Sequence, residues 1–155
     1  MNIVLYPDDP LTVMAAPVEQ FGPRLEKLAA RMLEAMYEHE GVGLAAPQVG
    51  IAERFFVCHD LETDPLCLVN PEIIDMEGEA VADEGCLSIP QIYAPVQRAT
   101  RIRVRAKAPL GNDLDFEARD FLARIIQHET DHLDGRVFID RLDILTRQSK
   151  LKEWE

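Results

Sequence analysis

The chain has few cysteines, and their number is odd. Only three occur in 155 residues, Cys58, Cys67 and Cys86, and they lie in different sequence settings. Small domains that depend on disulfides carry a dense, even set of cysteines. The sequence therefore predicts thiols that are buried or bound to a metal, and it argues against a disulfide framework.

Long apolar runs are also missing. No apolar stretch approaches the roughly 20 residues that span a bilayer. The first residues, Met-Asn-Ile-Val-Leu-Tyr-Pro, lack the basic start and the long apolar stretch of a signal peptide. We therefore expect a cytoplasmic protein that does not associate with a membrane.

Basic residues are scarce. Lys and Arg number 16 against 28 Asp and Glu, which gives a formal net charge of -12. Nucleic acids and anionic membranes are bound through clustered Lys and Arg, so no direct nucleic-acid binding is expected. The local exception is residues 100–107, where basic residues alternate with apolar ones. This pattern predicts a half-buried strand with a solvated basic face.

The rest of the composition is that of an ordinary globular protein. The hydrophobic fraction is 47% and the charged fraction 28%, and the length suits one domain with a substantial core. Strands are predicted over residues 54–58 and over residues 67–70, the second closed by Pro71.

Helical spacing of apolar residues predicts two main helices. The first covers residues 24–40 and is ended by Gly41. The second covers residues 118–134, with Phe121 among its apolar residues and Gly135 as a left-handed C-cap. Residues 143–155 are expected to form a short third helix. The sequence therefore predicts an α+β fold, a single compact domain over residues 1–155 with antiparallel or mixed strands.

The second helix carries the motif His128-Glu129-Thr130-Asp131-His132. Residues four apart share one face of a helix, so His128 and His132 can present two imidazoles to one metal ion. Glu129 then lies beside the open side of the ion, where it could move protons. Asp131 and Asp134 are expected to solvate or cap the helix.

A catalytic metal site of this kind needs a third protein ligand and one open position. A carboxylate, a third histidine or Cys86 could supply the ligand. His39 and His59 are expected to be ordinary helix-end and strand-end residues. Cys86 lies in a short segment between Gly85 and Pro90, where the backbone can approach a ligand closely. Cys58 and Cys67 fit core positions better.

Three segments together resemble the peptide deformylase family in its bacterial form, in the family's order and approximate spacing. They are Gly41-Val42-Gly43-Leu44-Ala45-Ala46-Pro47-Gln48, Glu84-Gly85-Cys86-Leu87-Ser88 and Gln127-His128-Glu129-Thr130-Asp131-His132-Leu133. The resemblance covers nearly the whole chain. It implies hydrolysis of the N-formyl group from the N-terminal formyl-methionine of new polypeptides, with release of formate.

By this resemblance, Cys86, His128 and His132 would hold one divalent metal on a central metal-binding helix, with water as the fourth ligand. Ferrous iron (Fe2+) is the expected physiological metal, while Zn2+, Ni2+ or Co2+ can occupy such a site. On coordination chemistry alone, one thiolate and two imidazoles indicate a zinc site.

The resemblance also implies roles around the metal. Glu129 would act as general base and then general acid, while the Gln48 side chain and the Leu87 backbone N–H would stabilise the oxyanion. The remaining implied residues bind substrate: Val42, Gly43, Leu44, Gly85, Ile125 and His128 near the methionine pocket, and Glu84 paired with Arg98 in support of it.

The expected partners are N-formyl-Met nascent peptides at the ribosome, and the expected state is a monomer. Because the chain after Leu142 is short, docking to the ribosome through the tail is in doubt. Three other interpretations stay open. They are a metallopeptidase that cuts internal amide bonds, a closed structural metal site, and an enzyme that uses Cys86 as a nucleophile.

Overall fold

The computed structural model describes residues 1–155, which form three α-helices, two 3-10 helices and seven strands. The helices are α1 (Pro23–Glu38), α2 (Asp120–Leu133) and α3 (Ile144–Trp154), with η1 (Ala46–Val49) and η2 (Phe138–Arg141). The strands are β1 (Gly43–Ala45), β2 (Phe55–Cys58), β3 (Leu66–Glu77), β4 (Ala80–Cys86), β5 (Ile89–Arg98), β6 (Arg101–Lys107) and β7 (Asp113–Arg119).

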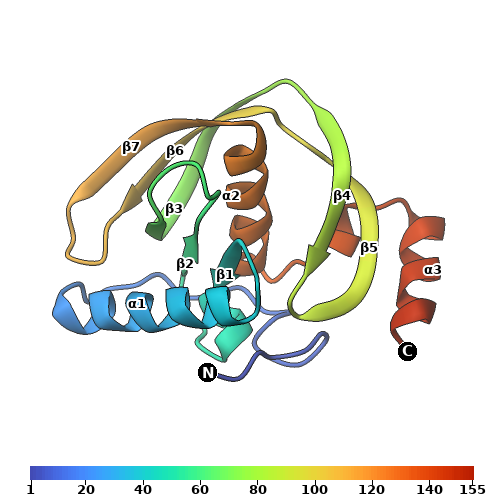
Figure 1. The fold of residues 1–155 in the computed structure, drawn as a ribbon, viewed down its shortest axis with the longest axis horizontal. Helices are drawn as coiled ribbons and strands as arrows, with labels where there is room; N and C mark the ends of the chain where they lie inside the picture. The colour runs from blue at the N-terminus through green and yellow to red at the C-terminus, as the bar shows by residue number, and fades with distance from the viewer.

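Two sheets enclose one central helix. Five strands pair in the order β1-β2-β3-β6-β7, and β4 and β5 form a separate two-stranded ribbon. All of these pairs are antiparallel. Helix α2 stands between the larger sheet and the ribbon, while α1 crosses the base of the sheet and α3 lies beyond β5 (Figure 1). The expected α+β class, a single compact domain with strands around a central helix, is confirmed.

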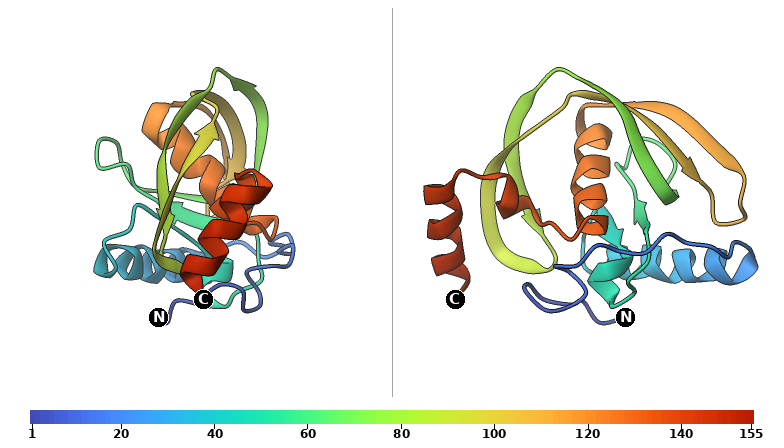
Figure 2. Two further views of the ribbon diagram at one scale, coloured as in Figure 1. Left: turned by 90° about the vertical axis from the view of Figure 1, so that its right-hand side faces the viewer. Right: turned by 180° about the vertical axis from the view of Figure 1, so that it is seen from behind.

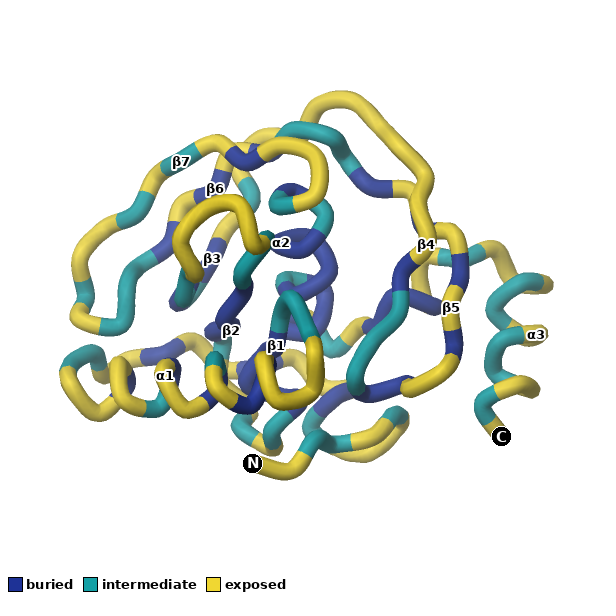
Figure 3. The backbone as a smooth tube through the Cα atoms, in the orientation of Figure 1, coloured by how far each residue is buried: buried dark blue, intermediate teal, exposed yellow.

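The larger sheet is covered on both faces, because successive side chains of a strand point in opposite directions. Phe56 of β2 belongs to an apolar cluster with Ile126 of α2. Its neighbour Phe55 belongs to a second cluster, with Met32 and Met36 of α1. The most deeply buried backbone accordingly runs through β1, β2 and α2 (Figure 3). This packing fixes α2 against the sheet.

Strand β3 is longer than the sequence predicts. It continues through Pro71 to Glu77, whereas the prediction closed it at Asn70. Asn70 takes a left-handed φ of 50°, and the pairing with β6 shifts register between Val69 and Glu72. A proline has no N–H to donate to a ladder, and a bulge is one of the places in a sheet that tolerate it.

The helix boundaries also differ from the prediction. Helix α1 ends at Glu38, and Glu40 adopts a φ of 57° before Gly41. Helix α2 begins at Asp120, because Ala118 still belongs to β7. The third predicted helix is confirmed as α3, whose Trp154 Nε1 donates to the Tyr6 carbonyl at 3.0 Å. This contact ties the C-terminal helix to the N-terminal segment, and both termini lie on the same side of the molecule (Figure 2).

Gly135 ends α2 as predicted. Its φ is +75°, its N–H bonds to the His132 carbonyl at 3.1 Å, and the N–H of Arg136 bonds to the Asp131 carbonyl at 2.9 Å. These are the two bonds of a Schellman motif. A Cβ at Gly135 would lie 2.8 Å from the backbone carbon of Val13.

We therefore expect Gly135→Ala to lower the free energy of unfolding. The control is Gly50→Ala, since Gly50 has a φ of +86° but nothing within 4 Å of its Cβ position. The control should lose about 1–2 kcal/mol from the left-handed backbone. Gly135→Ala should lose about 1–3 kcal/mol more, because its Cβ crowds the backbone. Urea unfolding measures the free energy of unfolding of both variants. Equal losses in the two would contradict a clash between the added Cβ at Gly135 and the backbone of Val13.

The sequence did not indicate the ribbon or β7. The short segment before Pro90, where the backbone was expected to approach a ligand, is the closing end of the β4–β5 hairpin, with Leu87 and Ser88 as its turn. On the basic face of β6, Arg103 and Arg105 are exposed, while Arg101 and Lys107 are half-buried. Acidic side chains of the neighbouring strands neutralise this face. Arg101 pairs with Asp75 and Glu117 at 2.7 and 3.0 Å. No helix of the protein is both long and apolar enough to cross a membrane.

Candidate metal centre and active site

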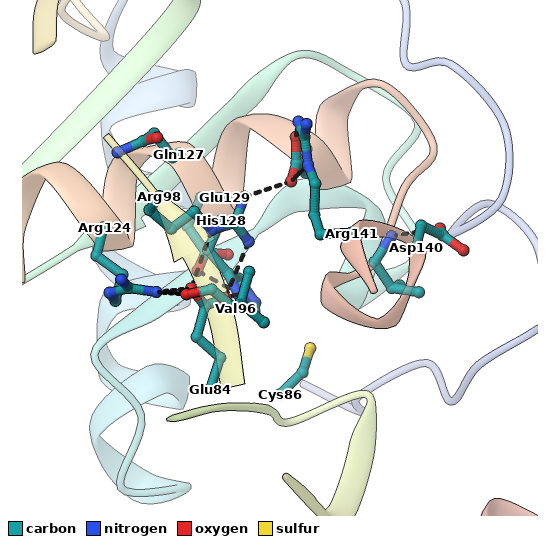
Figure 4. A network of polar contacts seen from close by, with 12 residues as sticks. Glu84, Cys86, Val96, Arg98, Arg124, Gln127, His128, Glu129, Asp140 and Arg141 are labelled. Carbon is teal, nitrogen blue, oxygen red and sulfur yellow. Dashed lines mark hydrogen bonds and ion pairs between the residues drawn. The ribbon is translucent and has the colours of Figure 1, made fainter. Parts of the chain in front are cut away.

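One cluster of side chains could hold a metal ion. It joins Cys86, at the end of β4, to His128 and His132, which lie one turn apart on α2. Their ligand atoms all lie within 4.8 Å of one another, and Cys86 Sγ is 3.3 Å from His132 Nε2. The sequence motif and a cysteine 42 positions before it therefore meet at one point. Figure 4 shows two members of this cluster, Cys86 and His128.

A buried carboxylate fixes the orientation of His128. Its Nδ1 lies 2.8 Å from Glu84 Oε1. An ionised carboxylate only accepts hydrogen bonds, so Nδ1 carries the proton. In the neutral ring, the form that binds a metal, Nε2 then keeps its lone pair free on the side away from Glu84. Outer carboxylates of this kind set the tautomer of ligand histidines.

Glu84 is itself held by two arginines. Arg98 donates to both carboxylate oxygens through Nε and Nη2, each at 2.9 Å. Arg124 donates from Nη1 to Oε2 at 2.6 Å. Burial alone would raise the pKa of Glu84, but the hydrogen bonds from Arg98 and His128 hold it well below its usual value. Glu84 is therefore ionised at neutral pH. The importance of Arg124 was not indicated by the sequence, where it looks like any polar helix residue.

Asp131 corrects one prediction. It does not solvate the helix: its side chain is buried and accepts from Arg98 Nη1 at 2.6 Å and from Arg141 Nε at 3.0 Å. Burial would raise the pKa of Asp131, and the two arginines lower it. Asp134, by contrast, is the C-cap residue and pairs with Arg54 at 2.9 Å. The ion pairs of Asp131 anchor the motif helix to β5 and η2.

The thiol of Cys86 and the nearby imidazoles shift each other's pKa values. Burial would raise the pKa of Cys86, but the neighbouring His132 and His128 hold it well below its usual value. Burial would lower the pKa of His128, while Glu129, Cys86 and Glu84 raise it well above its usual value. Cys86 is thus poised as a thiolate, the form that binds metals. Burial raises the pKa of Cys67 to about 12, as expected for a core thiol.

Gln48 points its amide nitrogen into the cluster. Its Oε1 accepts from the Ala45 backbone N–H at 2.9 Å, which fixes the direction of the amide. Its Nε2 then faces Ser88 Oγ at 3.1 Å and Cys86 Sγ at 3.4 Å. The side chain is 1% exposed. A donor is therefore held beside the candidate metal position.

Glu129 is buried beside the cluster and lacks partners. Its Oε2 is 4.0 Å from His128 Nε2. Its Oε1 and His132 Nδ1 are the two buried side-chain polar atoms without a hydrogen-bond partner. Unpaired buried polar groups are rare and mark functional places. Burial, helped by the charges of Cys86 and Glu84, raises the pKa of Glu129, although the two histidines oppose this rise.

Gly43 leaves the space that Glu129 occupies. A Cβ at Gly43 would lie 2.5 Å from Glu129 Oε2. We expect Gly43→Ala to displace the carboxylate and to lower kcat/KM about 10- to 100-fold, since a misplacement near 1 Å can cost that much. The control is Gly41→Ala, whose Cβ would approach the flexible end of the Leu87 side chain at 3.0 Å and otherwise make ordinary contacts, at 3.5 Å or more. Steady-state kinetics compare the two, and equal rates would contradict the steric argument.

A pocket of about 280 Å³ opens beside the cluster. Of the residues expected at the substrate, it is lined by Val42, Gly43, Gly85, Ile125, Glu84, Gln48, Leu87, His128 and Glu129. Leu44 and Arg98 do not line it. The Leu44 side chain is fully buried in the cluster on the α1 side, and Arg98 lies behind Glu84.

Besides Glu40, Gly41 and Asp83, three residues of α2 and β5 line the same pocket, although the sequence did not assign them to it. Phe121 was expected in the core, but its side chain is 51% exposed and faces the pocket. Tyr93 of β5 and Arg124 of α2 are the others. All three depend on the ribbon and α2 facing each other, which local sequence patterns do not reveal.

The donor set fits a divalent metal. Cys86, His128 and His132 offer one thiolate and two imidazoles, and no fourth side chain joins them. Three protein ligands with one open position are typical of catalytic sites, whereas structural sites are closed by four. Together with the adjacent buried carboxylate, this geometry defines the class of metal-dependent hydrolases.

Comparisons with known proteins narrow the class to one family. A model of the polypeptide deformylase family matches residues 1–148. The chain is 48% identical to the peptide deformylase of Alkalilimnicola ehrlichii, over 96% of this chain and 85% of that protein. It is 46% identical to that of Neisseria gonorrhoeae, over 98% of this chain and 92% of that protein.

Solved structures of peptide deformylases have the same fold as this chain. Peptide deformylase from Thermus thermophilus superposes with a TM-score of 0.93 at 43% identity, covering 97% of this chain and 90% of that one. The enzyme from Legionella pneumophila gives a TM-score of 0.92 at 37% identity, covering 99% and 92%. The chain belongs to the peptide deformylase family, and it is an enzyme.

Proposed function

We propose that this enzyme removes the formyl group from N-terminal formyl-methionine with the help of one divalent ion held by Cys86, His128 and His132. The observation that carries the proposal is the convergence of these three ligand atoms beside Glu129, a buried carboxylate whose Oε1 has no hydrogen-bond partner. When bound, such an ion supplies Lewis acidity and lowers the pKa of a water molecule towards ~7. The family resemblance favours Fe2+, and the donor set also accommodates Zn2+, Ni2+ or Co2+.

Glu129 moves the proton. Its free Oε1 accepts a proton from the attacking water, and the new C–O bond forms at the formyl carbon. The same carboxyl group then gives the proton to the amide nitrogen as the C–N bond breaks, which releases formate and the free amine. A carboxyl whose pKa is raised by burial suits a group that must take up and release a proton near neutral pH.

Two donors stabilise the charge on the formyl oxygen. Gln48 Nε2 is directed at the cluster by the bond from Ala45, and the backbone N–H of Leu87 follows Cys86 in the hairpin turn. Donors held in place before the reaction need no reorganisation in the transition state, and one such donor is often worth about 3 kcal/mol.

The pocket supplies specificity. Val42 and Ile125 line it and offer apolar contact to the methionine side chain. Gly43 of β1 and Gly85 of β4 line the pocket, where their backbone groups can pair with an extended peptide. Leu44, the next residue of β1, packs its side chain away from the pocket. Glu84, held by Arg98, keeps His128 in place and so acts on substrate binding indirectly.

We further propose that the enzyme is cytoplasmic, works as a monomer and meets its substrates as nascent chains at the ribosome. The acidic surface, with a net charge of -12, supports action on the peptide without direct contact with nucleic acid.

The test is formate release from formyl-Met-Ala-Ser by anaerobically purified protein with verified metal content. N-acetyl-Met-Ala-Ser is the matched control, because its acyl group is one methyl larger. We expect rapid release from the formyl peptide and none of the corresponding acetate. Absence of formate from metal-loaded protein would overturn the proposal.

A further inference from the structure

One wall of the substrate pocket is a single stripe of α2. Phe121, Arg124, Ile125 and His128 all line the pocket, and they recur at the spacing of residues that share one helix face. Phe121 and Ile125 are apolar, as a methionine pocket requires, and His128 belongs to the metal cluster. Arg124 is the odd member, because it places a guanidinium where an apolar side chain would be expected.

Arg124 is held firmly in this position. Its Nη1 donates to Glu84 Oε2 at 2.6 Å and to the Val96 carbonyl at 2.8 Å, and its Nη2 donates to the Ala80 carbonyl at 2.8 Å. These bonds tie α2 to both strands of the ribbon (Figure 4). The side chain is only 12% exposed, so little water competes for it.

Part of the hydrogen-bonding capacity of Arg124 is unused. A guanidinium carries five N–H groups, and the three bonds above leave Nε and one hydrogen of Nη2 without a partner in the protein. Donors beside a pocket change what the pocket can accept. A purely apolar pocket rejects a side chain with a strong acceptor at its end, because the acceptor loses its water without compensation.

We propose that Arg124 is a specificity-determining residue that allows the pocket to accept formyl peptides beginning with methionine sulfoxide. Methionine sulfoxide keeps the length of methionine but ends in a polar oxygen. That oxygen can accept from the free N–H groups of Arg124, whereas the thioether of methionine is only a weak acceptor. Deformylation then proceeds unchanged: water adds to the formyl carbon, the C–N bond breaks, and the sulfoxide stays intact.

The inference rests on the proposed deformylase activity and is tested by a ratio. Formate release is measured from formyl-Met-Ala-Ser, formyl-norleucine-Ala-Ser and the two separated epimers of formyl-Met(sulfoxide)-Ala-Ser. Norleucine has the length of methionine without an acceptor, so it reports general damage to the site. The variant is Arg124→Met, and the control is Arg103→Met, since Arg103 lies on β6 and pairs only with Asp115.

In the wild type and in Arg103→Met we expect kcat/KM for one sulfoxide epimer within about tenfold of that for norleucine. In Arg124→Met the sulfoxide-to-norleucine ratio should fall a further 10- to 100-fold, about the value of a hydrogen bond to a charged group. A wild type that rejects both epimers, or a ratio that Arg124→Met leaves unchanged, would overturn the inference.

Failure of the proposed function gives a different result, namely no formate from formyl-Met-Ala-Ser in the wild type. Arg124→Met could also abolish turnover of every peptide, since Glu84 loses a donor. Arg124→Gln then takes its place, because its neutral amide can still donate to Glu84 but lacks the charged N–H groups that Arg124 leaves free. A sulfoxide-to-norleucine ratio at least about tenfold below wild type supports the inference, and an unchanged ratio contradicts it.

Discussion

Replacing Glu129 with glutamine is expected to lower kcat about 10²- to 10⁴-fold, the usual range for loss of a general acid–base group. Glutamine keeps the shape of the side chain but cannot take up the proton. The carboxylate is buried, and its Oε1 has no partner in the protein. Its loss should therefore leave the packing of α2 intact. KM should change little, because the group acts in the transition state.

The measurement is steady-state formate release at matched metal content. Glu153→Gln, on the exposed side of α3, is the control and should behave as wild type. Thermal unfolding of Glu129→Gln should match or exceed that of the wild type, because an uncompensated buried carboxylate is removed. A variant with undiminished kcat would remove Glu129 from the mechanism.

Replacing Cys86 with serine is expected to abolish retention of the ion and, with it, formate release. The histidines hold the pKa of Cys86 well below its usual value, so Cys86 would bind the ion as a thiolate. A serine hydroxyl stays protonated near neutral pH and is a poor ligand for the same ions. Only the imidazoles of His128 and His132 would then remain as ligands for the ion.

Cys67→Ser is the matched control, because Cys67 is a thiol of the core on β3 with its pKa raised to about 12. Metal content after gel filtration should stay near one ion per chain in the control and fall to background in Cys86→Ser. A fully loaded Cys86→Ser protein would show that another group completes the site.

Local spacing was enough to predict α2 and its motif. The four-residue separation of His128 and His132 and the left-handed Gly135 are properties of neighbouring residues, and the structure shows both as predicted. The same holds for β2 and for the alternation along β6. Each of these elements is specified by its own sequence.

The surroundings of the motif depend on long-range pairing, and the residues alone did not reveal them. The sequence of β4 shows no alternation because most of its residues are exposed, so the ribbon was missed. Only the ribbon brings Glu84 and Cys86 to α2. The buried roles of Asp131 and Arg124 follow from the same contact, since each pairs with a residue on, or held by, the ribbon.

We propose that one ion, held by Cys86, His128 and His132, is required for hydrolysis of the formyl group. Titration of metal-free protein with Fe2+ under anaerobic conditions, followed by formate release from formyl-Met-Ala-Ser, tests it most directly. We expect no formate release without metal and a linear rise of the rate with added Fe2+ that stops at one equivalent per chain. Full activity of the metal-free protein, or a rise that continues to two equivalents, would contradict it.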